Sequence, residues 1–108
     1  MIIESWERAL AEGKHTVVMM DDNLDTSENS VHNKVFNLKY LYELWQKYLN
    51  KHNITQHNFK YTHFRPNKNP SCIDHVLSNC PNNINNVTTN TNSLSDHSII
   101  TANYSNKN

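Results

Sequence analysis

The chain contains a single glycine, only two cysteines and no excess of charge of either sign. Ten basic residues balance ten acidic ones, so net charge predicts neither a general nucleic-acid binder nor a protein of the membrane surface. No apolar run approaches the roughly 18 residues of a membrane span, and no signal-peptide pattern begins the chain. Cys72 and Cys80 are too few for a disulfide framework and are expected to be buried thiols. We expect an intracellular protein, nuclear or cytoplasmic, without a membrane partner.

The 108 residues leave room for one domain with a small hydrophobic core. Apolar residues at helical spacing predict a helix over residues 2–12, and Gly13 is placed to end it. A continuously apolar run at 15–20 predicts a strand buried on both faces. A second helical stripe covers 38–49. Short segments bounded by Pro, Asn or Ser then predict a run of strands, at 53–56, 60–64, 72–78, 86–91 and 98–104. The expected fold class is therefore α/β turning β-rich, that is, α+β.

None of the five aspartates lies on a predicted helix. Three of them, Asp21, Asp22 and Asp25, directly follow the strand at 15–20. Asp74 lies inside an apolar strand, and Asp96 precedes the last one. Aspartate and asparagine are common in turns, so each group taken alone has an ordinary structural explanation. Taken together, the aspartates at strand ends could converge at one edge of a sheet.

Asp74 is the hardest of these to explain as a turn residue. A buried aspartate must be hydrogen-bonded or paired with a charge. His75 is a poor partner, because adjacent residues of a strand point to opposite faces. His97 can approach Asp74 from a neighbouring strand. Such a pair would fix the imidazole tautomer and raise the pKa of His97, favouring an imidazolium that can hydrogen-bond an anion.

Four short motifs occur in a characteristic order: MDDN at 20–23, YTHF at 61–64, SCIDHV at 71–76 and LSDH at 94–97. In this order they resemble the Mg-dependent endonuclease/exonuclease/phosphatase superfamily, and more narrowly its retrotransposon endonuclease branch. The resemblance covers nearly the whole chain. It departs from the pattern at Met20, where the family has glycine, and at His75, where an aromatic residue is usual.

The resemblance implies that residues 1–108 are the C-terminal half of such a domain. The implied fold is half of a four-layer α/β/β/α sandwich, with one mainly antiparallel sheet and two helices on one face. The family's first half supplies a metal-binding glutamate and further phosphate contacts. We therefore expect the chain to need a missing N-terminal half-domain or to self-associate through its uncovered face.

The resemblance also implies roles for single residues. Asp21 would orient the attacking water and Asn23 would contact the scissile phosphate. Asp74 would orient His97, which would donate to the phosphate. Asp96 would lie at the metal.

On the substrate side, the resemblance places Thr62 beside the phosphate, and Arg65 and Lys68 form a basic loop suited to the DNA backbone. Carboxylates suit Mg²⁺, with Mn²⁺ as a substitute, and the cation would stabilise charge during phosphodiester hydrolysis. The resemblance thus predicts a DNA endonuclease fragment that is incomplete for catalysis alone.

Two alternatives stay open. The chain could be a catalytically inactive remnant of a mobile element that keeps the fold without turnover. It could instead be a small zinc-binding interaction module, with His63, Cys72, His75 and Cys80 as ligands, although their spacing matches no familiar zinc pattern.

Overall fold

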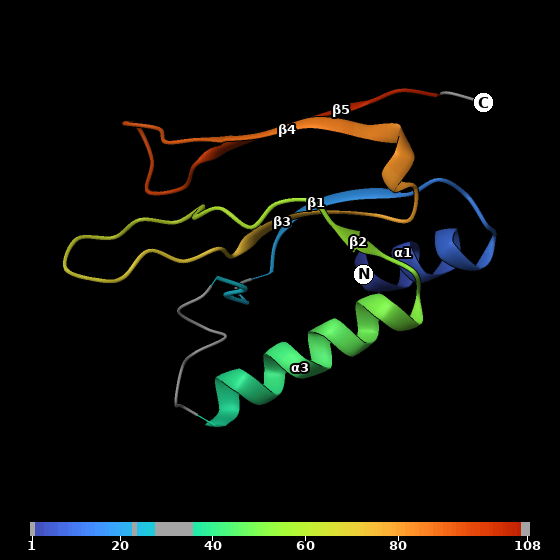
Figure 1. Ribbon diagram of the computed structural model, residues 1–108, viewed down its shortest axis with the longest axis horizontal. Helices are drawn as coiled ribbons and strands as arrows, with labels where there is room; N and C mark the ends of the chain where they lie inside the picture. Colours follow the sequence, from blue (N-terminus) through green and yellow to red (C-terminus); the bar gives the residue numbers. More distant parts are fainter. Residues whose placement is uncertain (1, 23, 28–35, 107–108) are drawn as a thin grey trace.

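The structure, a computed structural model, describes residues 2–22, 24–27 and 36–106. Its elements follow one another in the order shown in Figure 1. They are α1 (Ile2–Ala11), β1 (Val17–Asp21), α3 (Phe36–Lys51), β2 (Thr55–Gln56), β3 (Asp74–Ser78), the 3₁₀ helix η1 (Pro81–Asn83), β4 (Ile84–Asn90) and β5 (Ile99–Tyr104). The mixture of helices and antiparallel strands confirms the predicted α+β class. No helix among the described residues is long and apolar enough to cross a membrane.

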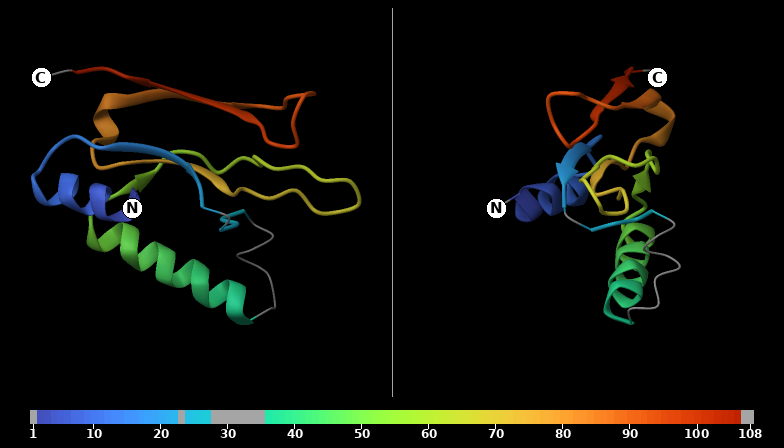
Figure 2. Two further views of the ribbon diagram at one scale, coloured as in Figure 1. Left: turned by 180° about the vertical axis from the view of Figure 1, so that it is seen from behind. Right: turned by 90° about the vertical axis from the view of Figure 1, so that its left-hand side faces the viewer.

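The described strands form two antiparallel sheets instead of the single sheet expected. One has the strand order β1-β3-β2, and the other is the hairpin β4-β5. The segment at 60–64, predicted as a strand, forms only isolated bridges at His63, to Ser71 and to His97. These bridges connect the two sheets at one end without extending into a ladder. Figures 1 and 2 show the hairpin on one side of the three-stranded sheet and both helices on the other.

The hydrophobic core lies between the helices and the three-stranded sheet. Its buried centre consists of Leu49 of α3, Leu77 of β3, and Ile54, which directly precedes β2. Partly buried residues from α1, β1 and α3 pack around it, namely Leu10, Val18, Met20, Trp45 and Tyr48. Both helices therefore cover the same face of this sheet, as expected.

Strand β1 is buried on one face only, which corrects the prediction that it is buried on both faces. Val17 is 38% and Met19 53% exposed, while Val18 and Met20 face the core. The central strand is β3, whose Val76 and Leu77 are almost completely buried. A continuous apolar run does not show whether both faces of a strand are covered, because that depends on which other segments pack against each face.

The predicted end of the first helix at Gly13 is confirmed. Gly13 has a φ of 70°, in the left-handed region that glycine adopts without strain. Its backbone N–H donates to the Leu10 carbonyl at 3.0 Å, and that of Lys14 donates to the Ala9 carbonyl at 3.2 Å. These two bonds make a Schellman cap. The chain then reverses into β1, whose last residue is Asp21.

Candidate metal and phosphate site

Asp74 and His97 form the pair expected from the sequence. Nδ1 of His97 donates to Oδ2 of Asp74 at 2.8 Å, and the two side chains are 36% and 17% exposed respectively. This hydrogen bond fixes the tautomer and raises the pKa of His97, against a smaller opposing effect of burial. His97 therefore favours its charged form, as predicted.

Asp21 lies beside this pair. It ends β1 directly opposite Asp74, the first residue of β3. The negative charge of Asp21 also helps to raise the pKa of His97. One donor atom each from Asp21, Asp74 and His97 lie within 4.8 Å of one another. A small pocket of about 210 Å³, lined in part by Asp21 and Asp74, opens here.

Asp96 lies next to His97 but faces a different imidazole. Nε2 of His63 donates to Oδ2 of Asp96 at 3.1 Å, and this bond lowers the pKa of the Asp96 carboxyl. The rings of His63 and His97 lie 4.5 Å apart between centroids. His63, Asp96 and His97 therefore form a second group of donor atoms within 4.8 Å of one another.

Thr62 has a different role from the one predicted. It is fully buried, so its side chain does not face a substrate. Its hydroxyl oxygen accepts the backbone N–H of Ile73 at 3.0 Å and that of Asp74 at 3.1 Å. Thr62 thus fixes the backbone that carries Asp74, and it affects the site only through that residue.

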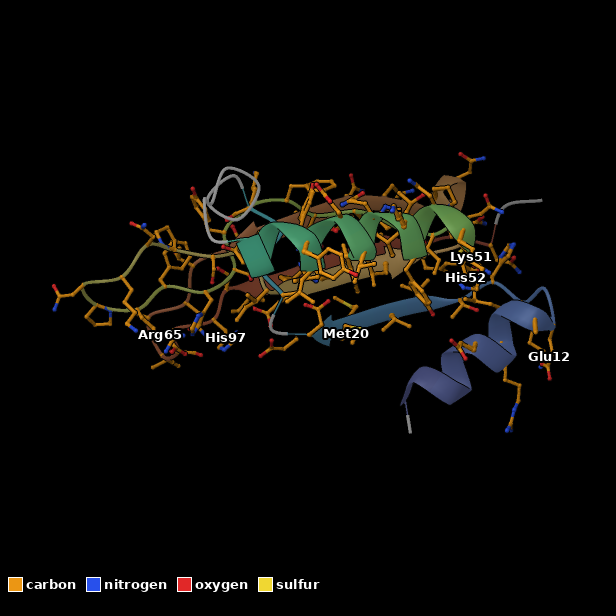
Figure 3. All side chains as sticks on the ribbon, turned by 90° about the horizontal axis from the view of Figure 1, so that it is seen from below. Glu12, Met20, Lys51, His52, Arg65 and His97 are labelled. Atoms are coloured by element: carbon orange, nitrogen blue, oxygen red, sulfur yellow. The ribbon has the colours of Figure 1, made fainter. Side chains whose placement is uncertain are left out.

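Arg65 and Lys68 lie in an exposed loop, as expected. The loop is attached to the site by a hydrogen bond from the backbone N–H of Phe64 to the Asp96 carbonyl, at 2.8 Å. Figure 3 shows Arg65 and His97 at the same end of the molecule, far from Glu12. Asn23, the remaining predicted site residue, lies outside the described residues.

A buried polar network on the opposite face of β3 was not predicted. Nδ1 of His75 donates to Oδ2 of Asp22 at 2.6 Å, and Nε2 lies 3.0 Å from both the Cys72 carbonyl and the Thr26 hydroxyl. The ring of Trp45 packs on that of His75, with 5.6 Å between centroids. Strand alternation correctly excluded His75 as the partner of Asp74. The same alternation, applied to Asp21 and Asp22, could have indicated the Asp22–His75 pair.

The zinc module suggested by the sequence does not assemble. Both cysteines are free and buried, as expected of simple thiols. Among the described residues, neither Cys72 nor Cys80 belongs to a group of three or more donors that could hold a metal. His63 and His75 are paired with different aspartates, Asp96 and Asp22.

The fold and the site together describe an α+β protein with a carboxylate–histidine cluster at one end of a sheet. Comparison with known proteins gives no match to a family model, to a curated protein or to a solved structure. The chemistry of the cluster is therefore the guide to function.

Proposed function

We propose that the chain is the C-terminal half of a metal-dependent phosphodiester hydrolase, a DNA endonuclease of the retrotransposon type. The observation that carries this proposal is the meeting of Asp21, Asp74 and His97 at one end of the molecule. These residues come from β1, from β3 and from the segment before β5. The motif resemblance requires that same convergence, although the residues are far apart in sequence.

The protein's own groups suit an anionic substrate. The bond to Asp74 occupies Nδ1 of His97 and raises the pKa of the ring, so that in the imidazolium form the second ring nitrogen, Nε2, can donate to a phosphate oxygen. Asp21 is exposed at the end of β1 and can accept a proton from a water molecule. Asp96 carries its negative charge at the surface beside His97.

A Mg²⁺ ion fits the carboxylates of this cluster. Hard oxygen donors suit Mg²⁺, which needs few protein ligands, and Asp21 and Asp74 supply such donors side by side. When bound, the cation would neutralise charge on a phosphoryl oxygen. Among the described residues, no glutamate joins either donor group. A complementary half-domain is therefore the partner that we propose, because the resemblance assigns the metal-binding glutamate to it.

DNA as the substrate is supported by two surfaces near the cluster. Arg65 and Lys68 place positive charge on the exposed loop that is bonded to Asp96, where they could contact backbone phosphates. Phe59, Tyr61 and Phe64 line an open pocket of about 660 Å³ that also includes Lys60. Exposed aromatic rings beside a basic side chain are suited to stacking on bases of a nucleic acid.

Nicking of supercoiled plasmid tests the proposal. The purified chain is assayed with Mg²⁺ and with EDTA, alone and together with the N-terminal half of a retrotransposon endonuclease. We expect Mg²⁺-dependent nicking in the combined reaction. His97→Ala should lower the rate on the order of 100-fold or more, as expected for loss of a donor that stabilises developing charge. The matched control is His15→Ala, because His15 is an exposed histidine whose ring bonds to Tyr104 instead.

The outcome also separates the hydrolase from an inactive mobile-element copy. A folded chain that nicks DNA neither alone nor with the added half would refute the hydrolase and favour the remnant. Equal nicking by His97→Ala and the unaltered chain would exclude the Asp21–Asp74–His97 cluster as the site.

A further inference from the structure

We propose that His63, Asp96 and His97 form a binding site for a late first-row divalent cation, with Zn²⁺ as its best ligand. This site shares two residues with the proposed hydrolase but does not depend on hydrolysis. The donor atoms of the three residues all lie within 4.8 Å of one another. The set includes no cysteine, unlike the zinc module considered from the sequence.

The backbone holds His63 firmly against the other two residues. His63 exchanges backbone hydrogen bonds with Ser71 in both directions, each at 3.0 Å, and is bridged to His97 on its other side. Phe64 donates to the Asp96 carbonyl at 2.8 Å. His63 is only 8% exposed, so its ring has little freedom to turn away. Backbone hydrogen bonds therefore join the two segments that supply the three residues.

The distance between two of the donor atoms suits a small cation. Two ligands of a tetrahedral Zn²⁺ ion, each roughly 2.0–2.1 Å from the metal, lie about 3.3 Å apart. Nε2 of His63 and Oδ2 of Asp96 are 3.1 Å apart. An ion between them would replace the hydrogen bond with only a small change in the separation of the two atoms. Three protein ligands would leave the fourth position of the metal to water.

The donor types select the metal. Two imidazoles and one carboxylate favour Zn²⁺, Ni²⁺, Co²⁺ or Cu²⁺ over Mg²⁺, which prefers oxygen ligands. The neighbouring group of Asp21, Asp74 and His97 has the opposite balance, with two carboxylates and one imidazole. As a second imidazole, His63 therefore shifts the metal preference at this end of the molecule from Mg²⁺ towards Zn²⁺.

Asp74 supports this site by orienting His97, although Asp74 is not one of the three proposed ligands. Histidine ligands of metals commonly donate their second ring N–H to a carboxylate, which orients the ring and raises its basicity. Nδ1 of His97 donates to Asp74 at 2.8 Å, so Nε2 is the nitrogen available for a metal. A Zn²⁺ ion bound here would occupy Asp96 and His97 and would thereby compete with their use in Mg²⁺-dependent hydrolysis.

Titration of the intact chain with Co²⁺, followed by displacement with Zn²⁺, tests the site without DNA. Visible absorption reports the coordination of Co²⁺, and near-ultraviolet bands would reveal thiolate ligands. We expect one Co²⁺ per chain, displaced by Zn²⁺ and not by Mg²⁺, without thiolate bands. His63→Phe should weaken binding at least 10-fold, and Asp74→Asn should weaken it on the order of 10- to 100-fold. The matched control, His15→Phe, should bind as the unaltered chain does.

A second measurement tests the site even if the His63→Phe variant fails to fold, because it uses only the unaltered chain. In the unaltered chain, Zn²⁺ should shift the ring NMR signals of His63 and His97 and leave those of His15 in place. Absence of Co²⁺ binding, equal binding by folded His63→Phe, or thiolate bands would overturn the site. Absence of nicking would count only against the hydrolase, because binding is read without substrate.

Discussion

Asp22 accepts a hydrogen bond from Nδ1 of His75 at 2.6 Å, with 0% of the histidine side chain and 10% of the aspartate side chain exposed. Both ring nitrogens of His75 face acceptors, because Nε2 lies 3.0 Å from the Cys72 carbonyl. Burial lowers the pKa of His75, but the bonds to Asp22 and Cys72 outweigh it and raise the pKa to about 9. The folded chain therefore holds an imidazolium beneath Trp45.

This pair makes the stability of the chain depend on pH. A histidine whose pKa is higher in the folded state stabilises the fold below its unfolded pKa of about 6.5, and this contribution is lost as pH rises towards 9. The free energy of unfolding should therefore fall by on the order of 3 kcal/mol between these pH values. Urea unfolding at a series of pH values measures the slope of the free energy of unfolding against pH.

Asp22→Asn should remove most of that slope. It leaves a buried imidazole without its carboxylate, which should cost about 3 kcal/mol at pH 6 and progressively less at higher pH. Glu12→Gln is the matched control, because Glu12 makes an exposed pair with Lys14 and should change stability by less than about 1 kcal/mol. A pH slope equal in Asp22→Asn and the unaltered chain would show that His75 is not its source.

Asp74→Asn should lower the pKa of His97. The hydrogen bond to Asp74 is the largest contribution to the raised pKa of His97, and the charges of Asp96 and Asp21 contribute less. NMR titration of the His97 ring measures the change. Asp96→Asn is the control and should lower this pKa by a smaller amount. Equal shifts in the two variants would mean that net charge, and not the bond to Asp74, sets the state of His97.

Parts of this site could be predicted because they depend on local rules. Alternation along a strand separates Asp74 from His75, and a single glycine marks the end of the first helix. The edge position of β1 and the burial of Thr62 depend on which segments pack beside them, which the local pattern does not contain. The proximity of His63 to Asp96 likewise arises from bridges between segments more than thirty residues apart.

Thr62→Val should destabilise the fold and disturb Asp74. The hydroxyl of Thr62 accepts two backbone N–H groups, and valine would leave both without an acceptor in a fully buried position. Each unpaired group costs about 1–3 kcal/mol, so we expect a loss of at least about 2 kcal/mol by urea unfolding. Thr62→Ser keeps the hydroxyl acceptor and should therefore retain most of the stability that Thr62→Val loses.

The control for Thr62→Val is Thr55→Val, because Thr55 lies exposed on β2. Valine is equally β-branched, so this change should stay within about 0.5 kcal/mol. If the two valine variants lost the same stability, the hydroxyl of Thr62 would have no special part in holding β3.

Self-association should occur through the open face and edge of β1. Among the described strands β1 pairs only with β3, and Val17 and Met19 expose apolar surface on the face away from the helices. An unpaired strand edge next to apolar side chains promotes pairing with another chain. Light scattering over a concentration series should show dimers or larger species. Met19→Lys should shift the chain towards monomer, because a charge on this face would have to be buried in the contact.

Leu94→Lys is the matched control for Met19→Lys. Leu94 is 93% exposed in the turn between β4 and β5 and is not part of β1, so the same change there should leave association unaltered. A strictly monomeric chain at all concentrations would contradict the prediction. Equal loss of association in both variants would indicate that added positive charge alone disperses the chains, and that β1 is not the contact.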